Sequence, residues 1–328
     1  MILRYWNVLH APVKYRSFKM YLTFLHFPLL CLYKLHTIDT NSGCINTQNM
    51  DNGGLNGAMN SLTDVEEKYR DQGLTRADLY VLASYVAVDM TMPDGDAINS
   101  PFIPFRHYGR NICDSTNPRR GPDPELCSPN LGTDEVVDFF QEHFDFTPRE
   151  TAAIMGAHTV GIMRRNILGF AGENGWVPNN QRFDNQYYQE LVGAGSNPVG
   201  HIEGAPQWRQ ATVNNTDLGL PDRFQWEGFP GGRKVVMLNS DVAMVRQLDD
   251  SNKHPTTGQV FCKFVEKDPT SVPRCPRARM DLFGPMVDYR QDNQSFLNDF
   301  RDAMIKMTDV GYQPRDCDAE GMCQLERI

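Results

Sequence analysis

A single histidine, His158, stands among small residues in the stretch "ETAAIMGAHTVG" (150–161). One nitrogen of an imidazole can bind a metal when an acceptor holds the other nitrogen in place. No second metal-binding residue lies close in sequence, and no CxxC pair is present, which argues against a zinc knuckle. Gly156, Ala157 and Gly161 remove bulk around the histidine, so a large flat group could approach the backbone.

A carboxylate that could serve as the acceptor lies downstream, in "MLNSDVAMV" (237–245). Asp241 falls near the start of a helix that Asn239 or Ser240 can cap, where the helix dipole favours the ionised form. A carboxylate bound to a metal-bound imidazole orients the ring and makes it more electron-donating. Haem iron needs only one protein ligand of this kind, which fits a lone histidine. The alternative is an ordinary histidine that bonds a backbone carbonyl.

Helical signals dominate the elements that must position these side chains. Apolar residues recur every three or four positions in 55–69, in 79–90, in 133–144 and in 296–307. Thr75 with Asp78 marks one helix start, and Thr147 with Pro148 and Glu150 marks the helix that runs into His158. The best strand is "RKVVML" (233–238), and long connections rich in Gly, Pro and Asn cover 93–132, 171–184 and 193–233. The pattern predicts a mostly α protein.

Several segments in a fixed order resemble the plant, fungal and bacterial haem peroxidase superfamily. They are "GCINTQNMDNGGLNGAMNSL", "ADLYVLASYVAV", "FRHYGRNIC", "ETAAIMGAHTVG", "RFDNQYYQELVG", "LNSDVAMV" and "SFLNDFRDAMIKM". The resemblance covers roughly residues 43 to 310. It implies an all-α haem peroxidase fold with very little β structure, in which two helical halves sandwich haem b. These would be a remnant distal half (43–115) and a proximal half (116–328), preceded by an unassigned segment (1–42).

The resemblance also implies roles for individual residues. His158 would be the axial ligand of the haem iron, and Asp241 would be its hydrogen-bonded carboxylate. Arg164 and Arg165 are candidates for contact with a haem propionate. Trp176, in "GENGWVPNNQRFDN", matches the tryptophan that lies against the proximal histidine in the intracellular class, and it would relay electrons or carry a radical. A tryptophan in a Gly-rich loop can instead be a packing anchor.

A proximal cation site is implied by the same segment. Thr159, Asn179 and Asp184 match ligand positions, with the main-chain oxygens of Val177 and Arg182 in addition. Oxygen ligands suit a hard cation, Ca²⁺ or K⁺, and a single carboxylate favours K⁺. Alternatively, Asp184 only caps the helix that follows it. The activity implied is hydrogen-peroxide-dependent one-electron oxidation of a small reductant, in response to oxidative stress.

The resemblance fails on the distal side. The family places an arginine and a histidine four residues apart on one helix, as R-x-x-[FW]-H, to move a proton of the peroxide and to stabilise the developing charge. None of the eight histidines of this chain has an arginine four residues before it, and Arg4 and His10 are six apart. Either a mis-spliced or truncated gene prediction or a real loss of catalysis explains this. A haem-binding pseudo-peroxidase and a haem-free scaffold stapled by cysteines remain as alternatives.

Composition sets further limits. The 328 residues carry a formal net charge of −9 without a run of Lys or Arg, which argues against nucleic acid as a partner. The apolar run at 20–33 is short for a membrane span, so no stable span is expected. It resembles a secretory signal, or else a mis-predicted N-terminus. The loops between Cys113 and Cys127, Cys262 and Cys275, and Cys317 and Cys323 suit disulfides, and secretion is the predicted location.

Overall fold

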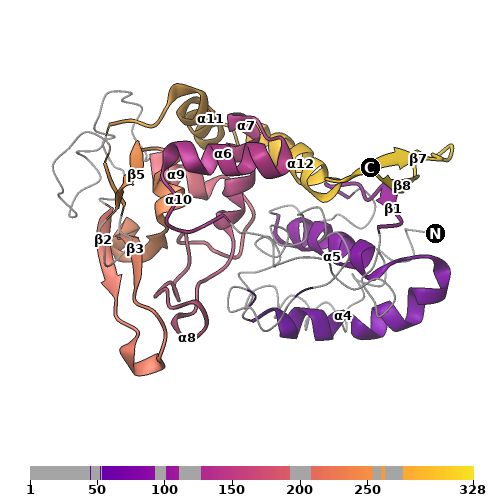
Figure 1. Ribbon diagram of the computed structural model, residues 1–328, viewed down its shortest axis with the longest axis horizontal. Helices are drawn as coiled ribbons and strands as arrows, with labels where there is room; N and C mark the ends of the chain where they lie inside the picture. The colour runs from indigo at the N-terminus through magenta and orange to yellow at the C-terminus, as the bar shows by residue number, and fades with distance from the viewer. Residues whose placement is uncertain are drawn as a thin grey trace. The chain divides into compact units, whose positions relative to one another are not determined.

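The computed structural model describes residues 45, 52, 54–92, 101–110, 127–192, 208–253, 260–262 and 276–328 (Figure 1). The chain divides into two compact units. Unit 1 comprises Met1–Leu126 and Met304–Ile328, and unit 2 comprises Cys127–Ala303. The predicted division into consecutive halves near residue 115 therefore differs from the structure, because the C-terminal segment returns to unit 1. The segment 1–42 lies outside the described residues.

Two of the predicted helices build unit 1. They are α4 (Leu55–Tyr69) and α5 (Arg76–Thr91), with a 3₁₀ turn η2 (Arg70–Gln72) between them. The predicted start of α5 is confirmed: the Asp78 amide donates to Thr75 Oγ1, and the Thr75 amide donates to Asp78 Oδ2. Nearly every side chain of α5 is buried, whereas α4 buries one face that includes Leu62 and Val65.

A small sheet and the end of α12 complete unit 1. Strand β1 (His107–Tyr108) pairs in parallel with β8 (Cys323–Arg327), which pairs in antiparallel fashion with β7 (Tyr312–Arg315). The last turns of α12 (Asn293–Thr308) contribute Thr308, whose hydroxyl bonds the Tyr85 hydroxyl at 2.6 Å. Segments far apart in sequence therefore share one core.

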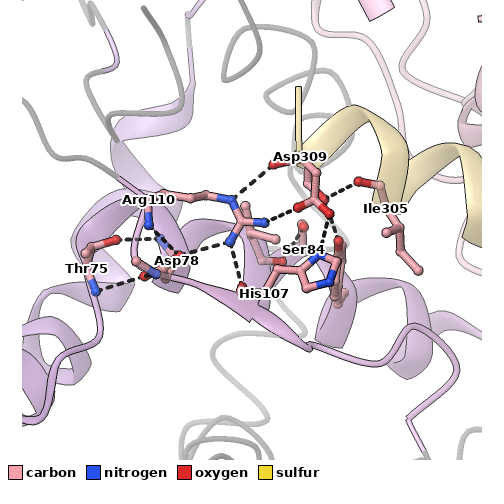
Figure 2. Close-up of polar contacts among 11 residues, drawn as sticks. Thr75, Asp78, Ser84, His107, Arg110, Ile305 and Asp309 are labelled. Atoms are coloured by element: carbon pink, nitrogen blue, oxygen red, sulfur yellow. Dashed lines mark hydrogen bonds and ion pairs between the residues drawn. The ribbon is translucent and has the colours of Figure 1, made fainter. Parts of the chain in front are cut away.

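A buried arginine, Arg110, holds these segments together (Figure 2). Its guanidinium donates to Asp78 Oδ1 at 2.9 Å and to Asp309 Oδ1 at 2.8 Å, while Nε donates to the Thr308 carbonyl at 3.1 Å. Asp309 also pairs with the His107 ring through the other carboxylate oxygen. We call Asp78, His107, Arg110 and Asp309 the Arg110 cluster. The acceptors of the Arg110 guanidinium are thus supplied by the protein itself.

Helices form most of unit 2. α6 and α7 confirm two predicted helices, and α7 leads into the 3₁₀ turn η3 that carries His158. Helix α11 packs against α7 and α9, and it was not predicted. The helical elements are α6 (Thr133–Phe144), α7 (Pro148–Met155), η3 (Gly156–Thr159), α8 (Arg165–Leu168), α9 (Gln186–Val192), η4 (Thr216–Leu218), η5 (Pro230–Gly232), α10 (Asn239–Val242), α11 (Met280–Gln291) and most of α12.

An aromatic core lies beneath the end of α7. Tyr188, Phe183 and Phe296 stack or meet edge to face, with ring centroids 5.0 to 5.5 Å apart. A Cβ atom on Gly156 would come within 2.2 Å of the Tyr188 hydroxyl and 2.5 Å of the Phe296 ring. The interpretation that Gly156 makes room for a flat ligand is therefore wrong, because protein side chains take that space.

The strands of unit 2 form two small sheets. β2 (Arg209–Val213), β3 (Arg223–Gly228) and β4 (Val235–Met237) pair in antiparallel order, and β5 (Leu248–Lys253) pairs with β6 (Val260–Cys262). Only β4 was predicted, because β2 and β3 fall in a stretch whose Gly, Pro and Asn content indicates a loop. Among the described residues, no helix is long and apolar enough to cross a membrane.

The cysteines fulfil the disulfide prediction in part. Cys317 and Cys323 form a disulfide in the C-terminal tail of unit 1. Cys127 is a free thiol in the described part of the chain, so the expectation that it takes part in a disulfide is wrong. Cys31, Cys44, Cys113 and Cys275 lie outside the described residues.

Candidate active site

His158 and Asp241 form a buried pair in unit 2. His158 lies in η3, which continues the turn of α7, and Asp241 lies in the short helix α10. The His158 Nδ1 atom and the Asp241 Oδ1 atom are 2.7 Å apart, and the side chains are 9% and 0% exposed. A carboxylate can only accept, so Nδ1 carries the hydrogen. Nε2 then presents its lone pair, as a metal ligand must.

Three donors fix the position of the Asp241 carboxylate. Besides His158, the Tyr187 hydroxyl donates to Oδ1 at 2.9 Å, and the Leu238 amide donates to Oδ2 at 2.8 Å. The Leu238 contact is the cap of α10, so the backbone at the helix start holds the carboxylate. Tyr187, in α9, was not predicted as a site residue, because only its fold-dependent approach to Asp241 distinguishes it from its neighbour Tyr188.

Trp176 lies flat against the histidine. The two ring centroids are 3.8 Å apart and the planes differ by 6°. The indole is 1% exposed, and the loop that carries it is tied to β4 by a hydrogen bond from the Val236 amide to the Gly175 carbonyl. The structure thus brings together His158, Asp241 and Trp176, which come from three separate segments.

The histidine itself fits the ligation of haem. Its Nδ1 is used by Asp241, and Nε2 has no hydrogen-bond partner among the described residues. Trp176 and the three hydrogen bonds to Asp241 restrain the orientation of the ring. A neutral imidazole with one free nitrogen and a carboxylate behind it is the donor set that haem iron accepts from proteins.

A thiol lies near this pair. Burial raises the pKa of the Cys127 thiol, and the Asp241 charge raises that pKa further. The sulfur therefore stays protonated at neutral pH, and it is not a thiolate ligand or nucleophile.

The predicted cation ligands meet only in part. Thr159 Oγ1 donates to Asp184 Oδ1 at 3.4 Å, and the Asn179 backbone N–H donates to Gln186 Oε1 at 2.7 Å. The other Asp184 oxygen pairs with Arg182 Nε at 3.2 Å. A positive charge therefore already neutralises the one predicted carboxylate ligand. In the part of the chain that the structure describes, no group of three His, Cys, Asp or Glu side chains is placed to hold a metal ion.

Arg164 and Arg165, the residues predicted to contact a haem propionate, have different surroundings. The Arg165 guanidinium forms an exposed double contact with Asp217, one arm of which is 3.0 Å long. Arg164 precedes α8 as its N-cap residue and is half-buried. Contact of either residue with a propionate stays a prediction.

The described histidines other than His158 offer no distal base. The His107 ring pairs with Asp309 in the Arg110 cluster, and His143 Nδ1 bonds the Phe139 carbonyl at 2.8 Å. Their positions agree with the sequence, in which neither follows an arginine by four residues. Of the two constellations that the resemblance predicts, the described residues therefore bring together the side chains predicted for the proximal one.

Comparisons with known proteins support the assignment. The family model described as peroxidase matches residues 40–254. The chain is 29% identical over 271 residues to a putative heme-binding peroxidase of Pyricularia oryzae, covering 82% of this chain and 69% of that protein. It is 33% identical over 265 residues to L-ascorbate peroxidase 2, cytosolic, of Arabidopsis thaliana, with 81% and 72% covered.

A more distant relative has another name. A putative mitochondrial cytochrome c peroxidase of Yarrowia lipolytica is 24% identical over 261 residues, covering 79% of this chain and 68% of that protein. The match to the family model spans well over half of the chain and includes both His158 and Asp241. The chain therefore belongs to the haem peroxidase superfamily, a group of oxidoreductases that act on hydrogen peroxide.

Proposed function

We propose that this chain binds haem b through Nε2 of His158 and catalyses the hydrogen-peroxide-dependent one-electron oxidation of a small reductant, in response to oxidative stress. The observation that carries the proposal is the 2.7 Å contact between His158 Nδ1 and Asp241 Oδ1, with Trp176 stacked on the ring. The bound haem would supply the redox chemistry with peroxide.

The residues of the chain would each have a defined task. Asp241 fixes the tautomer of the neutral ring with the hydrogen on Nδ1, so that the lone pair on Nε2 faces the iron. The carboxylate also makes the imidazole a stronger electron donor. Trp176, in contact with the whole face of the ring, would be the relay for electrons that arrive from a donor. Tyr187 holds Asp241 in place through its hydroxyl.

Two finer assignments stay predictions. A proximal Ca²⁺ or K⁺ ion would have to displace or tolerate Arg182 at Asp184. Secretion has no support from the relatives, two of which are named as cytosolic or mitochondrial.

Haem binding is tested by titrating the purified full chain with hemin. A saturable Soret band is expected, and His158→Ala should abolish it or shift it to that of free hemin. His143→Ala is the matched control, because His143 bonds a helix carbonyl in the same unit. An unchanged spectrum in His158→Ala would disprove the proposal.

A second function, haem binding without turnover, is favoured by the missing R-x-x-[FW]-H pattern. General acid–base catalysis typically contributes about 10²- to 10⁴-fold to a rate, so a chain without a distal base should react slowly with peroxide. Peroxide-dependent oxidation of a phenol decides between the two. If turnover is absent but rises when free imidazole is added as an external base, the chain is a haem protein that lacks only its distal catalyst.

A further inference from the structure

Two arginines face each other in unit 2, outside the haem site. Arg246 follows α10, and Arg277 precedes α11. They form an isolated antiparallel bridge, flanked by hydrogen bonds from the Gln247 amide to the Pro276 carbonyl and from the Ala278 amide to the Val245 carbonyl. Residues directly opposite each other in such a bridge project to the same side, so the two guanidinium groups are neighbours.

Arg246 is buried without a counter-ion among the described residues. The residue is 8% exposed, and its Nε atom is buried with no hydrogen-bond partner in this part of the chain. Burial, and next the charge of Arg277, lower the pKa of Arg246. Within the described residues, no carboxylate pairs with its side chain.

Arg277 is positively charged like Arg246, so it cannot balance the charge of Arg246. None of the described residues balances the charge of Arg277. Its Nη1 atom lies 3.8 Å from the sulfur of Met280, and its guanidinium lies over the Phe283 ring at 4.8 Å. Neither contact supplies a negative charge. The bridge therefore places two cations side by side, an arrangement that destabilises a fold unless something compensates.

Carboxylates are present nearby, but they serve another arginine. Arg279 binds Asp281 through two nitrogens, each at 2.7 Å, and reaches Asp134 at 3.6 Å. The second oxygen of Asp134 accepts a hydrogen bond from the Gln247 side chain at 3.2 Å. The described residues of unit 2 thus neutralise the charge of Arg279 but supply no negative charge to Arg246 or Arg277.

We propose that Arg246 and Arg277 form a binding site for a small doubly charged oxyanion of the phosphate type. Two guanidinium groups supply planar forks of N–H donors that match the oxygens of such an anion, and its two negative charges balance the two arginines. The anion would complete a buried charge cluster as Asp78 and Asp309 do for Arg110. The site is independent of haem and of the proposed peroxidase function.

Calorimetric titration of the full chain with inorganic phosphate, at constant ionic strength set by sodium chloride, tests the site. We expect saturable binding with a stoichiometry of one. Arg246→Met and Arg277→Gln should each weaken it at least tenfold. Arg301→Gln is the matched control, because it removes one positive charge from an exposed pair with Asp302 in the same unit. This variant should bind phosphate as the wild type does.

Thermal unfolding gives a second readout that does not depend on the heat of binding. Phosphate should raise the midpoint of the wild type and leave that of Arg246→Met unchanged. Without phosphate, Arg246→Met should unfold at a higher temperature than the wild type, because it removes an unpaired buried charge.

Either of two results would overturn the proposal. One is an effect of phosphate that chloride reproduces at the same ionic strength, or that Arg301→Gln loses as fully as Arg246→Met. The other is a wild type that shows no saturable binding of phosphate. In that case, loss of stability in Glu266→Gln or Asp268→Asn would point to a partner for the arginines in the segment 263–275, which lies outside the described residues.

Discussion

Arg110 in unit 1 and Arg246 in unit 2 are both buried arginines, and their surroundings are opposite. Arg110 is 1% exposed and donates to two carboxylates and to the carbonyls of His107 and Thr308. The charges of Asp78 and Asp309 raise its pKa even though burial alone would lower it. Arg246 has no such partners among the residues that the structure describes, and burial and the charge of Arg277 lower its pKa. The first charge is satisfied within the fold, and the second is left for a ligand.

The His158–Asp241 pair is intermediate between these two arginines in the number of partners that the described residues supply. One nitrogen of the histidine is held by the protein, and the other has no described partner. A metal-bound imidazole needs this arrangement, in which an acceptor holds one nitrogen and the other nitrogen is left for the metal. The three groups thus differ in how many partners the described residues supply.

The largest expected effect on stability comes from removing the arginine of the Arg110 cluster. Arg110→Met would leave Asp78 buried and Asp309 partly buried without their cation, so the free energy of unfolding should fall by about 3–5 kcal/mol. Urea unfolding followed by circular dichroism measures it. Arg315→Met, which removes a 60% exposed arginine paired with Glu326, should change the value by less than about 1 kcal/mol. Equal losses in the two variants would refute the contrast drawn above.

A buried carboxylate with too few partners should respond to pH. Asp89 is 1% exposed, accepts one bond from the Phe102 amide, and leaves Oδ2 without a partner among the described residues. Burial raises its pKa from 3.8 to about 7. The folded state thus prefers the neutral form, and this contribution to stability is full below about pH 4 and is lost as the pH rises through about 7.

Asp89→Asn removes this titration and keeps an acceptor for Phe102. The variant should match the wild type at about pH 4 and exceed its free energy of unfolding at about pH 8, by at most about 4 kcal/mol. Urea unfolding at both pH values measures the difference between the two proteins, in which the remaining titrating groups cancel. A constant difference across this range would contradict the assignment.

Removing the carboxylate of Asp241, which binds His158 Nδ1, should weaken cofactor binding. Changes to the group behind a metal-bound histidine typically reduce affinity or activity about 10- to 100-fold, and we expect a loss of this size in hemin affinity for Asp241→Asn. The iron reduction potential should rise, since the imidazole donates less electron density. Potentiometric titration measures it, with Asp302→Asn at the surface as control. An unchanged potential would remove Asp241 from the site.

The smallest effect is expected from Tyr187→Phe, which removes one of the three donors to Asp241. The lost hydrogen bond should reduce the free energy of unfolding by about 1–3 kcal/mol and shift the iron potential by less than Asp241→Asn does. Tyr188→Phe is a matched control, since its hydroxyl donates to the Ala152 carbonyl and not to Asp241. A potential that moves equally in both variants would show a general effect of packing.

The sequence predicted the elements whose signals are local. Thr75 with Asp78 and Thr147 with Glu150 mark helix starts within four residues, and both caps are present. The hairpin of β2 and β3 was missed because its residues read as a loop, and its pairing depends on contacts across the sheet.

For the site, the resemblance predicted His158, Asp241 and Trp176, which the structure places in contact. Their roles toward haem still await experiment. Tyr187 and the bridge between Arg246 and Arg277 could not be predicted, because each joins segments whose distance is set only by the fold. The same holds for Gly156, whose lack of a side chain serves the aromatic core.

The Arg110 cluster also bears on how this chain acquires its structure during synthesis. Asp78 and Arg110 are translated early, whereas Thr308 and Asp309 emerge only after all of unit 2 has left the ribosome. Domains generally fold as units while the chain elongates. Unit 2 is continuous and can begin to fold on its own, but the part of unit 1 that is made first lacks the Thr308 and Asp309 partners of Arg110 until the end of synthesis. Translation that stops before Asp309 would therefore leave a nascent chain whose first helices lack the contacts that close them.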